Sequence, residues 1–408
     1  MWNAIAEIGD SEFIPEEFDV TERTKDTFSS NIKSIEVKYF HYLPEGIVFD
    51  ILVKVAARHL HEDFRLVCKA WKEMISTSDF ISANAIQTKP ILLVQGVNSR
   101  DPPRFNVKEL ELSEKQLHYR LRDFGLSRFI CIRCSCNGLL LVSDVKKPGV
   151  LEAMNLVTKC CVTLPKCPSD CPHLHCGVAL GYDSRTKKYK VVHVYADLFG
   201  FEIFTIGGSD NEWKRVCGPW KDAHHERPFD LNFYWSNPIL TNERFMHWFV
   251  DSDDYFISMD VSEEKFFKMR LPAGCGKAIN RHKYHLMEFD GNLALAQNVS
   301  PTQIDIWILG DFHGQDWFKQ HSILAESTKY TTSTDSSSCK NRENGFPNLS
   351  KLVPLGIIKN GEVLMFTGTG TNSCIYLYKT NRREMKKFKL TVKNLETLIP
   401  HRSTLCHW

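Results

Sequence analysis

The sequence contains no apolar run long enough to cross a lipid bilayer. Uninterrupted runs such as Ile91–Val94 and Leu139–Val142 have four residues, whereas a membrane-spanning helix needs roughly 20. The first 20 residues hold six acidic side chains and no Lys or Arg, so the basic and then apolar pattern of a secretory signal is missing. We therefore expect a protein of the cytoplasm, the nucleus or both, with no membrane partner.

Motifs of the common enzyme classes are also missing. The sequence has no Gly-x-Ser-x-Gly elbow, no glycine-rich phosphate loop and no His-Glu-x-x-His motif. Its formal net charge is only +2, which gives no electrostatic reason to expect a nucleic-acid partner. His224, His225 and His247 are candidates for bases or metal ligands in a channel, but isolated histidines are more often surface or core residues. We expect no catalytic activity and no cofactor.

The 14 cysteines are expected to be reduced thiols in these compartments, not a disulfide framework. Side chains able to bind a metal gather in one stretch, at Cys160, Cys161, Cys167, Cys171, His173, His175 and Cys176. Zinc needs thiolates and imidazoles that meet tetrahedrally, and Cys167 and Cys171 with His175 or Cys176 have that chemistry. The paired spacing of a zinc finger is absent, however, so we favour a cysteine-rich loop and predict no metal site. A second group, Cys131, Cys134 and Cys136, falls in an alternating stretch typical of a strand with small buried side chains.

The most distinctive feature that is present is a pair of amphipathic helices within residues 43–80. Apolar side chains of the first helix share one stripe at Ile47, Val48, Ile51, Leu52 and Val55. The second helix repeats this spacing at Leu60, Phe64, Val67, Cys68, Trp71 and Ile75. Pro44 and Glu45 suit the first turn of the first helix. A helical pair of about forty residues cannot bury all this apolar surface within itself, so the rest of the chain or another protein must cover part of it.

The two helices together resemble an F-box. Leu43-Pro44 opens the motif, an Ile-Val-x-x-Ile-Leu core follows, and the second half reads Phe64-Arg65-x-Val67-Cys68-Lys69-x-Trp71 before a closing Ile75 and Phe80. The link between the helices, ARHLHED, lacks the usual proline. The alternative is an ordinary helical hairpin that packs on the main domain.

The F-box resemblance implies docking to a Skp-type adaptor and, through it, to a cullin ubiquitin ligase. It assigns nine residues to the adaptor interface or to the core that holds this interface, without dividing them between these roles. They are Leu43, Pro44, Ile47, Ile51, Leu52, Phe64, Val67, Cys68 and Trp71.

From about residue 90 the pattern changes to short strands separated by turn residues. Similar units recur about every 45 to 70 residues, at 136–165, 179–216, 242–272, 289–323 and 359–390, and residues 91–94 with 105–112 supply a sixth. This spacing is typical of four-stranded propeller blades, which bury their faces by stacking radially. We predict an α+β multi-domain protein with an all-β propeller of about six blades. A pair of β-sandwiches is the alternative.

Short phrases in the strand region add a second resemblance. They are Asn137-Gly138-Leu139, Gly181-Tyr182-Asp183 with Tyr189-Lys190-Val191-Val192, and Asp305-Ile306-Trp307. In this order behind the helical pair, they resemble the F-box-associated domain of plant F-box proteins, which is similar to a degenerate kelch propeller. The kelch Gly-Gly doublet occurs only once, at Gly207-Gly208.

The expected organisation has four parts: a flexible acidic leader at 1–38, an F-box-like helical domain at 39–84, an F-box-associated propeller at 90–395 and a C-terminal tail at 396–408. The two resemblances imply a non-catalytic substrate-recognition subunit of a Skp-cullin-F-box ubiquitin ligase, whose target protein the sequence does not identify. Two alternatives stay open. One is a propeller enzyme or metal-containing protein, and the other is a propeller binding protein that acts outside any ligase.

Overall fold

The computed structural model describes the chain from residue 43 to residue 406, with internal gaps. The gaps are 99–102, 113–118, 172, 174–175, 196–199, 221–237, 251–254, 274–283, 333–344, 359–361, 369–373 and 390–394. The expected acidic leader, 1–38, lies outside the described residues. The chain forms two compact units: a helical unit made of the residues up to Pro90 with Asn155–Lys159 and Arg402–His407, and a propeller unit made of the remainder.

The helical unit is built from short helices. They are α3 (Glu45–Leu52), α4 (Ala57–Glu62), the 3₁₀ turn η2 (Phe64–Leu66), α5 (Lys69–Ile75) and α6 (Ser78–Gln87). Pro44 precedes α3 with φ −54° and ψ 143°, and Glu45 places a carboxylate at the positive end of the helix. Thr77 caps α6 by accepting a hydrogen bond from the backbone N–H of Phe80. Among the described residues, no helix is long and apolar enough to cross a membrane.

The second expected helix is interrupted. The apolar spacing continues from Leu60 to Ile75, but the backbone leaves the α-helix at Asp63 and again at Cys68, which is extended with φ −157°. Between them, η2 turns the chain so that the ring of Phe64 stacks on Trp71 with 5.9 Å between centroids. The interruption therefore keeps the apolar contacts that the pattern predicted while changing the direction of the chain.

Two distant segments complete the core of the helical unit. Val157 and Leu405 pack with the buried side chains of the helices, which include Leu52, Leu60 and Phe80. The side chain of Asn155 holds the two segments together by donating hydrogen bonds to the carbonyls of Thr404 and Cys406. The helical unit is thus made from three parts of the chain.

The propeller unit contains six sheets among the described residues. The first sheet is β25-β1-β2-β3, with β25 (Leu395–His401), β1 (Ile91–Asn98), β2 (Arg104–Leu112) and β3 (Tyr119–Asp123). The second is β4-β5-β6-β7, with β4 (Ile130–Cys136), β5 (Leu139–Asp144), β6 (Leu151–Met154) and β7 (Cys161–Thr163). The third is β8-β9-β10-β11, with β8 (Gly177–Asp183), β9 (Lys188–Tyr195), β10 (Gly200–Thr205) and β11 (Lys214–Val216).

The remaining sheets follow in chain order. The fourth is β12-β13-β14-β15, with β12 (Ile239–Thr241), β13 (Phe245–Trp248), β14 (Tyr255–Asp260) and β15 (Lys265–Arg270). The fifth is β16-β17-β18-β19, with β16 (Tyr284–Phe289), β17 (Asn292–Ser300), β18 (Gln303–Asp311) and β19 (Asp316–Leu324). The sixth is β21-β22-β23-β24-β20, with β21 (Leu352–Ile358), β22 (Val363–Gly368), β23 (Cys374–Lys379), β24 (Glu384–Lys389) and β20 (Lys329–Thr332). Short 3₁₀ turns η4 (Ala325–Ser327) and η5 (Leu349–Lys351) lie between strands.

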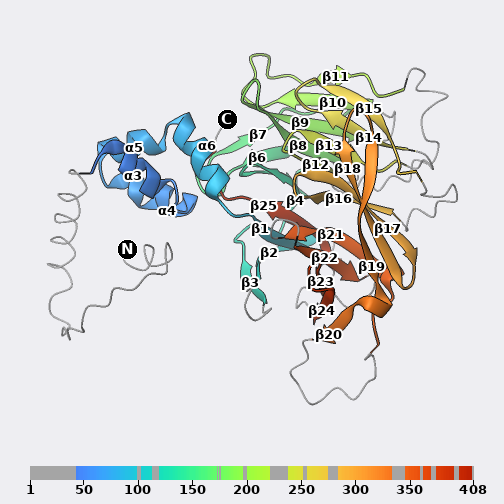
Figure 1. The fold of residues 1–408 in the computed structure, drawn as a ribbon. Helices are drawn as coiled ribbons and strands as arrows, with labels where there is room; N and C mark the ends of the chain where they lie inside the picture. The colour runs from blue at the N-terminus through green and yellow to red at the C-terminus, as the bar shows by residue number, and fades with distance from the viewer. Residues whose placement is uncertain are drawn as a thin grey trace, which may run out of the picture. The chain divides into compact units, whose positions relative to one another are not determined.

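The C-terminal strand closes the propeller ring. β25 pairs antiparallel with β1, in a register that places His401 opposite Ile91 and Ile399 opposite Leu93, and Figure 1 shows the red strand beside the blue one. The first sheet therefore combines one strand from the end of the chain with three from its start. Residues 396–408, which we expected as a tail beyond the propeller, supply most of this strand and part of the helical unit.

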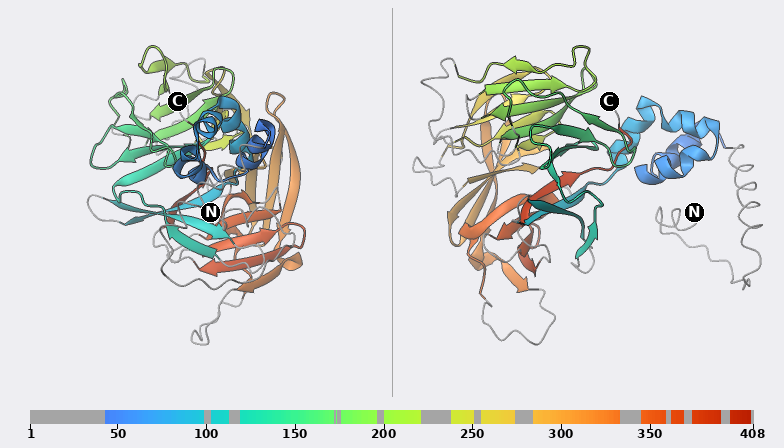
Figure 2. Two further views of the ribbon diagram at one scale, coloured as in Figure 1. Left: turned by 90° about the vertical axis from the view of Figure 1, so that its left-hand side faces the viewer. Right: turned by 180° about the vertical axis from the view of Figure 1, so that it is seen from behind.

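The sheets stack face to face, as the predicted propeller requires. Apolar clusters join the third sheet to the fourth, the fourth to the fifth, the fifth to the sixth and the sixth to the first. In Figure 2 (left) the colours run from teal through green and yellow to red around the unit. The two-residue turns that link neighbouring strands include Asn137-Gly138, with φ 44° and 88°, a conformation that favours these residue types in hairpins. The predicted helical domain followed by a propeller of about six blades is confirmed.

Candidate functional site

Helix α3 has one apolar face turned inward and another turned to solvent. Val48 and Leu52, four residues apart, are buried with exposed fractions of 5% and 1%. Ile47 and Ile51, also four residues apart, have exposed fractions of 46% and 39%, and Leu43, two residues before the helix, has an exposed fraction of 38%. Residues at this spacing lie on one side of a helix. We call these three residues the α3 stripe.

The structure divides the nine residues that the sequence assigned to the adaptor interface or its supporting core. Leu43, Pro44, Ile47 and Ile51 are exposed, whereas Leu52 and Trp71 are buried in the core of the helical unit. The other three are half-buried and pack against that core; they are Phe64, Val67 and Cys68. The exposed members come from the first turns of the motif, and the buried members position them.

Sequence reasoning missed Leu66, which lies on η2 with an exposed fraction of 73%. It falls outside the repeat of buried positions, so the search for an apolar stripe passed over it. An apolar residue on the outer face of a short amphipathic helix was the available signal. Charged side chains at Glu45, Asp50 and Lys54 are also exposed on and after α3. The α3 stripe is therefore an apolar surface within a polar setting.

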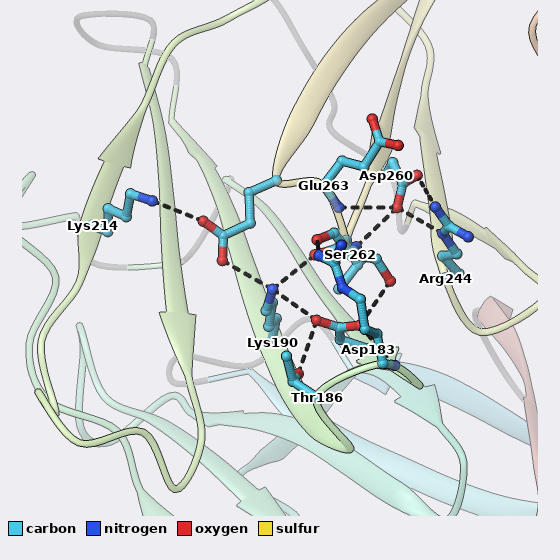
Figure 3. Close-up of polar contacts among 11 residues, drawn as sticks. Asp183, Thr186, Lys190, Lys214, Arg244, Asp260, Ser262 and Glu263 are labelled. Carbon is cyan, nitrogen blue, oxygen red and sulfur yellow. Dashed lines mark hydrogen bonds and ion pairs between the residues drawn. The ribbon is translucent and has the colours of Figure 1, made fainter.

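In the propeller unit, the short sequence segments that carry the second resemblance make contacts within and between the sheets. Asp183 and Lys190 come from the Gly-Tyr-Asp and Tyr-Lys-Val-Val phrases and lie on neighbouring strands β8 and β9. Lys190 Nζ is 3.2 Å from Asp183 Oδ2 and 2.9 Å from Glu264 Oε1, and it donates to the carbonyl of Val261 at 3.0 Å (Figure 3). Glu264 and Val261 belong to the fourth sheet's β14–β15 hairpin. This network thus ties the third sheet to the fourth.

The network holds the Asp183 carboxylate in its charged form. Burial raises the pKa of Asp183, but hydrogen bonds from Ser262, Thr186 and Lys190 outweigh this effect and lower its pKa well below the usual range. Ser262 Oγ donates to Asp183 Oδ1 at 2.8 Å and Thr186 Oγ1 donates to Oδ2 at 2.9 Å (Figure 3). Alongside, Arg244 pairs with Asp260 (Figure 3). Each buried carboxylate in this region therefore has a cationic partner, which points to a structural role.

The other quoted phrases also make contacts between sheets or within one blade. The Tyr189 hydroxyl donates to the carbonyl of Asn137 at 3.0 Å, which joins the third sheet to the turn after β4 in the second. Asp305, which follows Ile304 on β18, accepts hydrogen bonds from Lys319 and Ser322 at 2.7 Å each on β19. These phrases are explained by the architecture of the propeller.

Of the three histidines that we considered as bases or metal ligands, His247 lies among the residues that the structure describes, and it is a core residue. His247 has an exposed fraction of 1%, and its ring nitrogens contact Thr241 Oγ1 at 2.9 Å and Ser258 Oγ at 2.7 Å. Burial lowers the pKa of His247 to about 3, so the ring is neutral near pH 7. His224 and His225 lie outside the described residues.

The cysteine-rich stretch is brought together with side chains from the third sheet. Cys171, His173 and Cys176 of the loop before β8 meet His193 of β9, and Cys167 groups with His193 and Glu202 of β10. Sequence reasoning missed His193 and Glu202, which are distant in the chain. Cys160 and Cys161 are exposed and outside these groups, and His175 lies outside the described residues.

On β4, Cys131 and Cys136 are buried, and burial raises the pKa of Cys134 to about 12.

Comparison with known proteins extends these observations. Residues 98–406 match a family model described as the F-box associated beta propeller domain. The relatives include F-box protein At3g07870 of Arabidopsis thaliana, 25% identical over 363 residues that cover 79% of this chain and 82% of the relative. Another Arabidopsis thaliana protein, F-box protein At5g49610, is 26% identical and the alignment covers 70% of this chain and 80% of the relative.

Likeness to solved structures is weaker. TolB from Acinetobacter baumannii is 11% identical, with a TM-score of 0.45 over 82% of this chain and 73% of TolB. At this level the likeness adds nothing to the argument.

Proposed function

Because the chain belongs to the F-box proteins that carry an F-box associated β-propeller domain, we propose that it is the substrate-recognition subunit of a Skp-cullin-F-box ubiquitin ligase. In this role the helical unit binds a Skp-type adaptor, which connects it to a cullin, and the propeller unit binds a target protein. The chain itself makes and breaks no covalent bond. It acts in the cytoplasm, the nucleus or both by raising the local concentration of the target where ubiquitin is transferred.

The α3 stripe is the observation that carries this proposal. Val48 and Leu52 already fill the inner side of α3, so the core of the helical unit does not account for Leu43, Ile47 and Ile51. Full burial of an exposed side chain of this kind is worth roughly 1.5–3 kcal/mol, and covering the remaining exposed fraction of each stripe residue gains a corresponding share. A partner that covers the stripe gains this free energy, which gives a physical reason for binding at the start of the motif.

The stripe also indicates the kind of surface that the partner presents. Apolar side chains one helical turn apart fit a hydrophobic groove in the helix-in-groove mode of recognition. Exposed Asp50 and Lys54 supply polar groups beside the stripe, as at the rim of a typical interface. We therefore assign direct adaptor contacts to Leu43, Pro44, Ile47 and Ile51, and a supporting role to Leu52 and Trp71.

A double substitution tests the assignment. Ile47→Glu with Ile51→Glu places two charges on the stripe without altering the buried side of α3. We expect co-purification with the adaptor to fall by about 100-fold or more, because binding would then bury two carboxylates that have no cationic partner on the stripe. Ile86→Glu is the matched control, since Ile86 is an isoleucine on α6 with an exposed fraction of 76%.

Circular dichroism and thermal unfolding would show that both variants remain folded. Undiminished adaptor binding by the folded double variant would refute the assignment of the stripe.

The target protein can be sought without knowing its class. Affinity purification of the full chain under proteasome inhibition, followed by mass spectrometry, is expected to recover the adaptor, a cullin and at least one further protein. The Ile47→Glu, Ile51→Glu variant should lose the adaptor and cullin and keep the further protein. Recovery of binding partners without adaptor or cullin would instead favour a propeller that acts outside a ligase.

A further inference from the structure

A cluster of thiols and imidazoles lies in the propeller unit. Cys171, His173 and Cys176 come from the loop between β7 and β8, and His193 comes from the middle of β9. One ligand atom from each of the four lies within 4.8 Å of every other. All but Cys171, which is half-buried, are buried. Four potential ligands from separate parts of the chain thus converge on one point.

The spacing agrees with a tetrahedral metal centre. Zinc binds thiolate sulfur at about 2.3 Å and imidazole nitrogen at about 2.0–2.1 Å, so tetrahedral ligand atoms lie about 3.3–3.8 Å apart. His173 Nδ1 is 3.2 Å from Cys176 Sγ, close to one edge of such a tetrahedron. The imidazole rings of His173 and His193 have centroids 4.6 Å apart at an angle of 72°, which lets both rings point toward a common centre.

The surrounding groups orient the ligands. His193 Nδ1 is 3.2 Å from Glu202 Oε2 on the adjacent strand β10, and both side chains have an exposed fraction of 0%. Ser169 Oγ donates to the same carboxylate oxygen at 3.1 Å. A carboxylate on one ring nitrogen is the usual partner of a metal-bound histidine, and it presents the other nitrogen to the metal. The backbone N–H of His173 also donates to Cys171 Sγ at 3.4 Å, which suits a thiolate.

From this geometry we propose that Cys171, His173, Cys176 and His193 bind a zinc ion, with Glu202 as a positioning residue. Two thiolates and two neutral imidazoles balance the charge of Zn²⁺, so the buried centre is neutral. Soft sulfur with imidazole ligands selects zinc over the hard cations Mg²⁺ and Ca²⁺. All four protein ligands are supplied, as in a structural site. The ion attaches the loop that connects the second and third blades to the middle of the third blade.

The adjacent thiol of Cys167 borders this centre. It groups with His193 and Glu202, and its Sγ is 3.3 Å from Ser169 Oγ. We assign Cys167 to the surroundings of the zinc, because Cys171, His173 and Cys176 form a compact set of three ligands within six residues that His193 completes. Cys167→Ser should therefore keep the zinc that Cys171→Ser with Cys176→Ser loses.

Metal analysis of the purified full-length chain tests the proposal. The protein is expressed in zinc-supplemented medium, purified without chelator and measured by plasma mass spectrometry. We expect stoichiometric zinc in the wild type and in the control Cys161→Ser with Cys217→Ser, whose cysteines are exposed. Cys171→Ser with Cys176→Ser should retain about a tenth or less, because it removes half of the ligands. Zinc absent from the wild type, or equal in both double variants, would overturn the proposal.

A measurement on the wild type covers the case in which the ligand variant fails to fold. Replacement of zinc by Co²⁺ should give the visible absorption of a tetrahedral centre with sulfur-to-cobalt charge transfer, and added Zn²⁺ should abolish it. Glu202→Gln should keep this spectrum while weakening metal affinity by about 10- to 100-fold. An octahedral spectrum, or a Cys171–Cys176 disulfide found by thiol counting, would contradict the site.

Discussion

Lys190 Nζ lies 3.2 Å from Asp183 Oδ2 in the interior of the propeller unit, and the side chains have exposed fractions of 6% and 0%. The same ammonium reaches Glu264 of the next sheet at 2.9 Å. A buried charge is costly unless it is paired and hydrogen-bonded. Ser262 of the fourth sheet also donates to Asp183, so complete hydrogen bonding of this buried carboxylate depends on correct stacking of the third and fourth sheets.

Removal of the lysine charge is expected to destabilise the propeller strongly. Lys190→Met keeps most of the aliphatic side chain but leaves the Asp183 carboxylate buried without its cation, which costs about 3–5 kcal/mol. Urea unfolding measures this loss. Asp183→Asn with Lys190→Met should cost less than the sum of the single variants, since neither charge is then left alone. Additive effects would show that the pair does not interact.

Gly181 is expected to tolerate no side chain. A Cβ atom at this position would lie 2.7 Å from Met246 Cε and 2.7 Å from Val261 Cγ2, both on the fourth sheet. Gly181→Ala should therefore lower the free energy of unfolding by about 1–3 kcal/mol through overpacking. Gly181→Ala with Met246→Ala should lose less stability than the sum of the two single variants, because Met246→Ala removes one of the two clashing methyl groups. Thermal unfolding of the wild type, the two single variants and the double variant would measure the interaction between the two positions. Equal stability of the wild type and Gly181→Ala would contradict the predicted overpacking.

The stability of the propeller should fall in mild acid because of His247. Burial lowers the pKa of His247 to about 3 in the folded chain, while an unfolded histidine titrates near about 6.5. Between these values the unfolded chain binds more protons, so the free energy of unfolding decreases as pH falls. His247→Gln should flatten this dependence between about pH 6.5 and pH 4. His313→Gln, at an exposed position, is the control for the loss of one histidine.

The overall architecture could be predicted because it depends on local patterns. Alternating strands at regular intervals indicated about six blades, and turns such as Asn137-Gly138 marked the hairpins. The closing pair of β25 and β1 could not be predicted in the same way, because it joins residues some 300 positions apart in the chain and no local signal specifies a partner. The interruption of the second helix at Asp63 was hidden for a related reason: apolar spacing records which side chains are buried, not whether the backbone stays helical between them.

The candidate sites likewise contain some residues that local sequence patterns identify and others that only the folded structure brings together. Ile47 and Ile51 could be named from the sequence because helical spacing places them on one apolar stripe, and Leu43 because it opens the F-box resemblance. Leu52 beside them is buried in a core that also contains Val157 and Leu405, which come from elsewhere in the chain. Likewise, Cys171 and Cys176 were visible as a cysteine-rich stretch. Their proximity to His193 and Glu202 is a property of the folded third blade.

The neighbouring residues Ile51 and Leu52 offer the sharpest test of the helical unit, because they have similar size and opposite exposure. Leu52 is 1% exposed within the core, and Ile51 is 39% exposed. Leu52→Ala should destabilise the helical unit by about 2–5 kcal/mol, from lost burial and the cavity left behind. Ile51→Ala should change stability by no more than about 0.5 kcal/mol.

The same two variants should separate in adaptor binding. Ile51→Ala removes most of an apolar side chain that we assign to the interface, so its affinity for the Skp-type adaptor should fall by about tenfold or more. Leu52→Ala should bind with near-normal affinity at temperatures where it remains folded, because its side chain faces inward. Calorimetry of binding alongside thermal unfolding measures both quantities on each variant. A result in which Leu52→Ala alone weakened binding, with Ile51→Ala unaffected, would mean that the adaptor uses a different face of α3.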